Sequence, residues 1–250
     1  MNEQLNKVAK ITLLFWLMKI LATTLGETLG DFISMTLNLG YGVGIAITLA
    51  FFLLILIVQL SLKKYIPIVY WLVIVGTTTL GTEISDFLDR TWHLGYALGS
   101  VLLVSCLLLT LSLWYRKYND LEVYPIINKQ KEIFYWTAIL FSNSLGTAFG
   151  DFLSDNLGLG YLEGAIITGG VIILVVLLHY FTKINHILLF WIAFIFTRPF
   201  GATFGDFLTK PHSKGGLEFG TLPASLVSVG LMAILILLEY KKTGKRVSSR

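Results

Sequence analysis

Carboxylates recur at one fixed place in this sequence, and their surroundings recur with them. Asp31, Asp86, Asp151 and Asp206 each follow a small residue, precede a phenylalanine and lie 15 residues after a tryptophan. Each also lies five residues after a glycine, and successive aspartates are 55, 65 and 55 residues apart. If the four units pack together, their carboxylates converge, and crowded carboxylates either bind cations or hold protons.

Two glutamates extend this pattern. Glu27 lies one helical turn before Asp31, and Glu83 lies three residues before Asp86. We expect both glutamates and the four aspartates to bind a small cation or proton as substrate, with the four aspartates as the metal ligands. A single cysteine, Cys106, and four histidines without metal-ligand spacing leave oxygen as the main donor. Oxygen donors favour Mg²⁺, Mn²⁺ or Ca²⁺ over Zn²⁺ or Cu⁺, and no cofactor is expected.

Two basic residues interrupt the repeat. Lys19 and Arg198 stand where the other copies have apolar or neutral polar residues, well inside apolar segments. A charge at that depth is costly, so we expect both to pair with nearby carboxylates, as counter-ions or gating groups. Six acidic against two basic side chains leave a formal charge of −4, which favours cations.

The elements that carry these residues are long and apolar. Apolar residues make up 55% of the 250 residues, charged residues only 14%, and the mean hydropathy is +0.76. A soluble domain carries roughly 25% charged residues, and a helix needs ~20 apolar residues to cross the hydrocarbon of a bilayer. We expect an all-α membrane protein with eight transmembrane helices, at approximately 9–34, 43–62, 65–89, 96–114, 131–155, 162–181, 184–209 and 219–240.

The repeat divides this single transmembrane domain, residues 1–250, into four parallel two-helix units. The fourth unit departs from the others at Lys210-Pro211-His212. Glycines four residues apart, such as Gly26 and Gly30, let helices approach closely. They predict either that the four odd helices pack together or that each packs on its even partner. The units span approximately 9–62, 65–114, 131–181 and 184–240, with a central cytoplasmic linker at 115–130.

Basic residues predict the orientation, because loops rich in lysine and arginine stay in the cytoplasm. Only Arg90, Lys210 and Lys214 lie in loops within a unit. We therefore expect both termini in the cytoplasm and a multi-pass protein of the inner (plasma) membrane, whose basic residues serve topology and bind no nucleic acid. The termini and the loops between units hold Lys7, Lys10, Lys63, Lys64, Arg116, Lys117, Lys129, Lys131, Lys183, Lys241, Lys242, Lys245, Arg246 and Arg250.

The combination of tryptophan, Gly-x-x-x-Gly-Asp and Leu-Gly-Tyr resembles a known family. Units such as Lys19 to Phe32 are similar to those of bacterial membrane proteins built from four tandem copies of a repeat catalogued as a domain of unknown function. The resemblance covers nearly the whole chain and implies two transmembrane segments and a tryptophan per repeat. It implies no activity.

The residues therefore carry the functional prediction. No nucleophile–base pair and no nucleotide-binding motif is visible, so we expect no enzyme. We expect a membrane transporter for small inorganic cations, Mn²⁺-like and proton-coupled, that uses its intramembrane carboxylates. A proton or monovalent-cation channel and a non-transporting membrane scaffold or sensor remain alternatives. The bilayer and a small cation or proton are the expected partners, and a homo-oligomer is left open.

Overall fold

The computed structural model describes residues 5–248, with side chains as far as Lys241. Eight long α-helices account for most of this part of the chain, and it contains no strand. All eight predicted helices are present, with ends that differ from the expected ones by several residues. The helices are α1 (Leu13–Asp31), α2 (Tyr41–Ser61), α3 (Pro67–Asp86), α4 (Gly95–Tyr118), α5 (Lys129–Asp151), α6 (Tyr161–Phe181), α7 (His186–Thr209) and α8 (Thr221–Ser248).

Seven of these helices are long and apolar enough to span a membrane, as in a multi-pass membrane protein. The helix outside this set is α5. Its sequence includes Ser142, Asn143, Ser144 and Thr147, which lower its hydropathy. All four side chains are buried against other helices, so the polarity of α5 faces protein.

The four odd helices form a closed ring. Helix α1 contacts α3 and α7, and α5 contacts the same two helices from the opposite side. Each even helix packs mainly on the odd helix of the next unit: α2 on α3, α4 on α5, α6 on α7, and α8 back on α1. Of the two arrangements that the sequence left open, the structure shows the odd helices packed together, and an even helix has few contacts with the odd helix of its own unit.

Exposure follows this arrangement. Of the residues in the apolar stretch of each helix, 22–28% are buried in α2, α4, α6 and α8, against 61–78% in α1, α3 and α7. The even helices present rows of leucine, isoleucine and valine on their outer faces, such as Leu54, Leu109 and Ile173. This is the distribution a bundle needs when lipid surrounds it.

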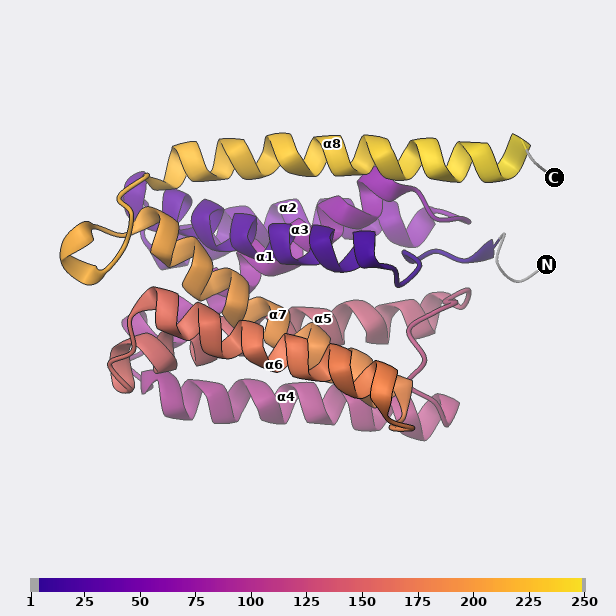
Figure 1. Ribbon diagram of the computed structural model, residues 1–250, viewed down its shortest axis with the longest axis horizontal. Helices are drawn as coiled ribbons and strands as arrows, with labels where there is room; N and C mark the ends of the chain where they lie inside the picture. Colours follow the sequence, from indigo (N-terminus) through magenta and orange to yellow (C-terminus); the bar gives the residue numbers. More distant parts are fainter. Residues whose placement is uncertain (1–4, 249–250) are drawn as a thin grey trace.

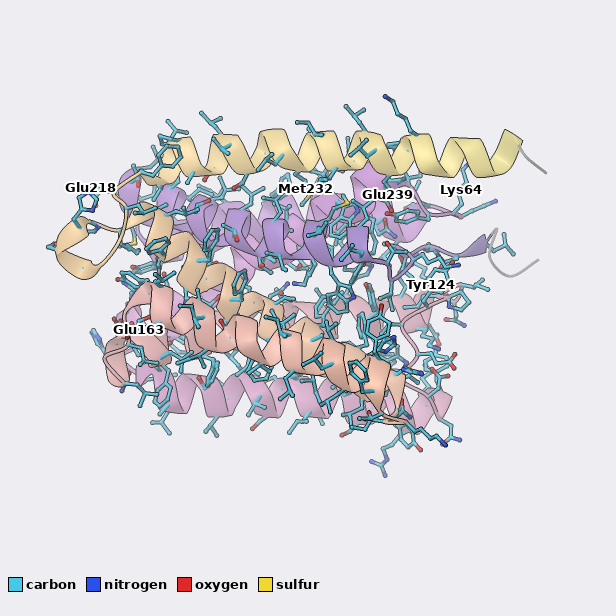
Figure 2. The ribbon with its side chains drawn as sticks, in the orientation of Figure 1. Lys64, Tyr124, Glu163, Glu218, Met232 and Glu239 are labelled. Carbon is cyan, nitrogen blue, oxygen red and sulfur yellow. The ribbon has the colours of Figure 1, made fainter. Side chains whose placement is uncertain are left out.

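The two ends of the bundle differ. The first and last described helices bring both ends of the described chain to one end of the molecule, as four parallel two-helix units require (Figure 1). Lys64 and Tyr124 lie at this end, and Glu163 and Glu218 at the other (Figure 2). Of the basic residues used to predict orientation, Arg250 lies outside the described residues, and the side chains of Lys242, Lys245 and Arg246 are likewise not described.

Aromatic and polar side chains close the ring at the end that holds the termini. The hydroxyl groups of Tyr70 and Tyr135 lie 2.5 Å apart, and Trp71 donates a hydrogen bond of 3.0 Å to Glu239. Lys7 lies in the terminal segment before α1, as expected, but its side chain is buried and paired with Glu132. The central linker is shorter than 115–130, because α4 continues to Tyr118 and α5 begins at Lys129.

At the opposite end, three of the odd helices widen just after their aspartate. A π-helical turn follows α1, α3 and α5, at Phe32–Thr36, Phe87–Thr91 and Phe152–Asn156. The fourth unit lacks this turn, because Pro211 has no N–H with which to continue the helix after Thr209. Lys210 instead begins a loop, whereas the matching residues of the other three units still lie in a helical turn.

Candidate carboxylate site

The four aspartates lie at the same end of the ring, where the odd helices finish. Asp31, Asp86 and Asp151 are the last residues of α1, α3 and α5, and Asp206 lies in the last turn of α7. All four side chains are buried, each with 5% or less of its surface exposed. The ring of parallel units thus brings the repeated carboxylates together, as the repeat predicted.

Two basic residues join these aspartates into pairs. The Nζ of Lys210 lies 2.5 Å from Asp31 Oδ2 and 3.3 Å from Asp206 Oδ1. Arg90 lies 3.5 Å from Asp86, measured from its Nε, and 3.9 Å from Asp151, measured from its Nη2. The fourfold repeat therefore becomes a twofold arrangement, with one cation for each pair of neighbouring units.

From the sequence, Arg90 and Lys210 are expected in loops, with a role in topology alone. Both lie four residues after an aspartate, a spacing that places two side chains on one face of a helix. That spacing is the signal that could have found them. Because they join the cluster, the five carboxylates of Glu27 and the four aspartates face three basic side chains, those of Arg90, Arg198 and Lys210. The excess of negative charge is two, smaller than the −4 expected.

Lys210 stays charged in this position. Burial alone would lower the pKa of its ammonium group, but the carboxylates of Asp206 and Asp31 outweigh that effect and raise the pKa above its ordinary value. At neutral pH the ammonium group is therefore a permanent positive charge between two carboxylates. It occupies the place that a small cation would take.

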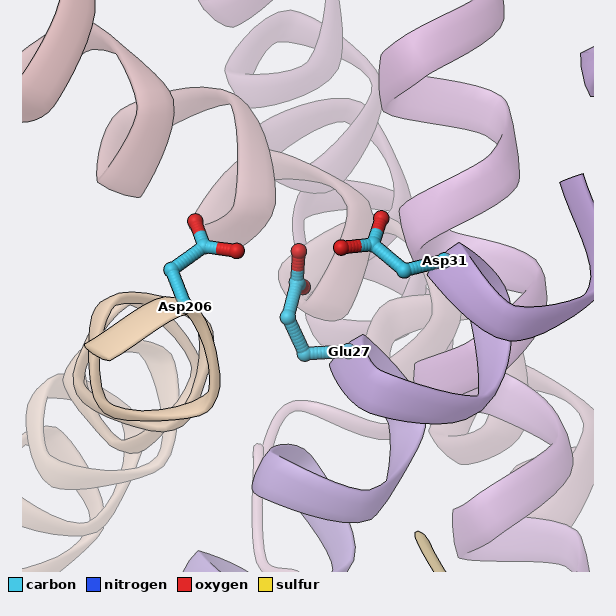
Figure 3. Close-up of side chains that lie close together, drawn as sticks. All are labelled: Glu27, Asp31 and Asp206. Atoms are coloured by element: carbon cyan, nitrogen blue, oxygen red, sulfur yellow. The ribbon is translucent and has the colours of Figure 1, made fainter. Parts of the chain in front are cut away.

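Three carboxylates form the group best suited to hold an ion. Glu27, Asp31 and Asp206 each offer one oxygen, and these oxygens lie within 4.8 Å of one another. Their carboxyl groups point toward a common centre, two from α1 and one from α7 (Figure 3). A divalent ion held at roughly 2.0–2.6 Å from its oxygen ligands fits such a group after a small inward movement of the side chains.

The predicted set of metal ligands is only partly reproduced by this group. Asp31 and Asp206 belong to it, and Glu27 adds a ligand that the metal prediction did not include. Asp86 and Asp151 lie instead on the Arg90 side of the ring. Glu83 belongs to neither group, because its carboxyl group lies at the contact of α3 with α2, against Gly44.

Arg198 lies deeper in the ring and is fully buried. Its Nη2 lies 2.8 Å from Glu27 Oε2 and also contacts Thr82 Oγ1, while its Nη1 donates a 3.0 Å hydrogen bond to the carbonyl oxygen of Thr23. The expected ion pair is confirmed for this residue. Since α7 and α3 are opposite each other in the ring, the contact with Thr82 crosses its interior.

Lys19 makes a second contact across the ring, farther from the aspartates. Its Nζ donates a 2.8 Å hydrogen bond to Asn143 Oδ1, from α1 to the opposite helix α5, and lies 4.2 Å from the centre of the Phe194 ring. Asn143 in turn donates to Thr77 Oγ1 at 3.0 Å. Among the described residues no carboxylate forms an ion pair with Lys19, so the prediction of pairing is wrong here. Its contacts are instead with an amide oxygen and an aromatic face.

Glycines make these contacts sterically feasible. A Cβ added at Gly26 would overlap Thr78 of α3, and one at Gly201 would overlap Thr23 of α1. The same position in α5, Gly146, faces Arg198, with only 2.5 Å between an added Cβ and the Arg198 Cβ. The first glycine of each unit therefore sets the spacing of the ring.

A small polar cavity lies beside two of the aspartates at this end. It measures about 80 Å³ and is lined by side chains that include Arg90, Asp151, Tyr161, Asp206 and Lys210. Apart from their ion-pair contacts with Arg90 and Lys210, Asp151 Oδ2 and Asp206 Oδ1 accept no hydrogen bond from the described residues. The cavity is large enough to admit water, which can solvate these oxygens.

Two histidines also meet, at the other end of the molecule. The Nδ1 atoms of His179 and His186 lie 3.1 Å apart, although their spacing of seven residues gave no metal-ligand signal. Both side chains are exposed, at the end of α6 and the start of α7. They are remote from the carboxylates and supply only two donors.

Comparison with known proteins identifies the repeat. A family model described as Repeat of Unknown Function (DUF347) matches the chain four times, at residues 14–65, 69–118, 134–185 and 189–244. These matches cover most of the chain and coincide with the four two-helix units. No curated protein and no solved structure matches the chain.

Proposed function

The chain belongs to the family of the Repeat of Unknown Function (DUF347), whose description names no activity, and from its own residues we propose that it is a multi-pass membrane transporter for small inorganic cations. One observation carries the proposal: three buried carboxylates from two neighbouring helices offer oxygens within 4.8 Å of one another, at one end of the helix ring. Acidic side chains inside a membrane are costly and are retained mainly where they serve ions or protons.

The donor set supports a divalent substrate. Three carboxylates supply only oxygen ligands, which suit Mn²⁺, Mg²⁺ and Ca²⁺, and we propose a Mn²⁺-like ion. Since Lys210 occupies the same carboxylates, the incoming ion must displace its ammonium group. This exchange of an internal cation for a substrate cation keeps the site neutralised in both states.

The cross-ring contacts favour a carrier over a channel. Arg198 and Lys19 each bridge opposite helices of the ring, and aromatic side chains close the end beyond them. An ion that reaches the carboxylates from the cavity therefore meets a filled interior. Transport then requires a second conformation in which these contacts open, driven by a gradient of protons or ions.

We further propose that the protein lies in the bacterial inner membrane with both termini in the cytoplasm. The distribution of lysine and arginine supports this orientation, since most of them lie at the end that holds the termini. The carboxylate cavity then faces outward.

A scaffold or sensor is the second candidate, and the pairing of the aspartates favours it. Every aspartate of the ring has a basic neighbour within 4.0 Å, so the charges could serve only to hold the four units together. Calorimetric titration of the purified protein with Mn²⁺ separates the two. A transporter binds the ion and loses binding in Asp31→Asn, whereas a scaffold shows no saturable binding in either protein.

A further inference from the structure

One buried carboxyl group takes no part in the ion pairs of the ring. Glu83 is fully buried in α3, at the contact with α2, and neither of its oxygens has a hydrogen-bond partner among the described residues. Gly44 of α2 leaves the space that it fills, since a Cβ added there would lie 2.6 Å from the carboxyl carbon. The structure thus encloses an ionisable group without satisfying it.

The same position in the other units is neutral. Thr28 accepts a 2.9 Å hydrogen bond from Ser225 of α8, and Thr203 lies 3.0 Å from a Cβ added at Gly164 of α6. The remaining unit has Ala148. In each case the residue faces an even helix of the preceding unit. A small or hydroxyl side chain therefore suffices for packing at this position, and the carboxyl group of Glu83 is not needed for it.

The surroundings of Glu83 disfavour a negative charge. The charged groups that act on it most strongly are acidic: Asp86 from α3, and Asp31 and Glu27 from α1. Among the described residues no basic side chain forms an ion pair with it. Ser34 lies beside it, but this hydroxyl already donates its proton to the carbonyl oxygen of Gly30 and can only accept another. An unpaired carboxylate in such a place is far more costly than the neutral acid.

We propose that Glu83 is a proton-binding site: it is held as a neutral carboxylic acid and releases its proton when a cation binds at Glu27, Asp31 and Asp206. The second half rests on the proposed function. A bound divalent ion offsets the negative charges of Asp31 and Glu27, so ionising Glu83 becomes less costly. The O–H bond breaks, its electron pair stays on the carboxylate, and water takes the proton. Glu83 thereby exchanges one proton for one substrate ion.

Infrared spectroscopy tests the protonated state without any ligand. At neutral pH the wild-type protein in lipid vesicles should show the carbonyl stretching band of a buried carboxylic acid, and Glu83→Gln should lose it. Glu163→Gln, which removes an exposed carboxyl group at the start of α6, is the matched control and should keep the band. A band that survives in a folded Glu83→Gln protein would overturn the proposal.

Isotope labelling gives a second form of this test, should Glu83→Gln fail to fold. Wild-type protein made with glutamate carrying ¹³C in its side-chain carboxyl group should show the band at lower frequency, and labelled Glu83→Asp should not show the shifted band. An unshifted band would place the proton on an aspartate and overturn the assignment to Glu83.

Proton release tests the exchange. Mn²⁺ is added to the purified protein in weak buffer with a pH-sensitive dye, and the bound ion is counted by calorimetry. Wild type should release about one proton more per bound Mn²⁺ than Glu83→Gln, which should still bind the ion. Equal release would overturn the exchange. Absence of Mn²⁺ binding in wild type would contradict the proposed function and the exchange together, and the infrared band would then decide the protonated state alone.

Discussion

At the scale of single residues, four aspartates that look equivalent in the sequence have different environments. Asp31 and Asp206 share the ammonium group of Lys210, while Asp86 and Asp151 share the guanidinium group of Arg90. Glu27 exists in only one unit, and it adds the third oxygen on the Lys210 side. The candidate site is therefore asymmetric, and the two pairs of aspartates should respond differently to substitution.

Asp206→Asn should weaken Mn²⁺ binding by more than about tenfold, which corresponds to ~1.4 kcal/mol, because it removes one of three charged ligands. Asp86→Asn, on the Arg90 side, should weaken it less. Calorimetric titration measures both affinities. Asp120→Asn, in the linker at the other end of the molecule, is the control and should bind like wild type; equal loss in all three variants would contradict a site at Asp206.

Lys210→Met should tighten Mn²⁺ binding, since the ion no longer competes with an internal ammonium group. If competition from the Lys210 ammonium group weakens ion binding by roughly 1–2 kcal/mol, its removal would raise the affinity about five- to thirtyfold. The same titration measures it, with Lys64→Met, an exposed residue at the opposite end of the bundle, as the control. Weaker binding in Lys210→Met would mean that Lys210 organises the carboxylates for the ion and does not compete with it.

Arg198→Met should destabilise the fold by about 3–5 kcal/mol, because it leaves the buried carboxylate of Glu27 without its partner. The double variant Arg198→Met/Glu27→Gln should recover most of this loss, since it removes the unpaired charge as well. Thermal unfolding in detergent, followed by circular dichroism, compares the variants. Equal stability of the single and double variants would show that the ion pair does not account for the effect.

At the scale of helices, the sequence predicts where the helices lie in the chain better than which helices pack against one another. Long apolar segments and the repeated tryptophan place all eight helices, because hydropathy and length are local properties. The contact of α2 with α3 is not a local property. Glycines such as Gly26 and Gly44 predict that another helix packs closely there, but they do not indicate which helix. The π-helical turn after Asp31 was also not predicted, since no residue in that stretch demands it.

Gly26→Ala should destabilise the protein by ~1–3 kcal/mol, because the added methyl group overlaps Thr78 where α1 meets α3. Gly230→Ala is the matched control: this glycine lies in α8 with nothing within 4 Å of an added Cβ, and alanine there should be neutral or stabilise by up to ~1 kcal/mol. Chemical or thermal denaturation gives both values. A tolerated Gly26→Ala would contradict the close ring contact.

At the scale of the whole molecule, the repeat predicts the ring but not what fills it. Four parallel units indicate convergence of their aspartates, which the structure bears out. Lys19 and Arg198 were expected to meet carboxylates, and only Arg198 does so. The difference is one of depth: Arg198 lies within reach of Glu27, while Lys19 lies nearer the aromatic end, beside Asn143 and Phe194.

The proposed orientation is testable with single cysteines. In a Cys106→Ser background, Lys214→Cys should react with a membrane-impermeant maleimide added outside intact cells, whereas Lys64→Cys should react only after permeabilisation. Both lysines are exposed in loops, at opposite ends of the bundle. The reverse labelling pattern would place the termini outside, and labelling of both from outside would show that the chain does not cross the membrane as proposed.

Ion flux into proteoliposomes tests the central claim most directly. Wild-type protein and the variants Asp31→Asn and Asp206→Asn are reconstituted, and uptake of Mn²⁺ is compared with that of Mg²⁺, Ca²⁺, Na⁺ and H⁺. The proposal predicts flux of a divalent ion, with Mn²⁺ foremost, that both variants lose while they remain folded and monodisperse. No flux of any of these ions, or equal flux in wild type and both variants, would contradict the carboxylate pathway.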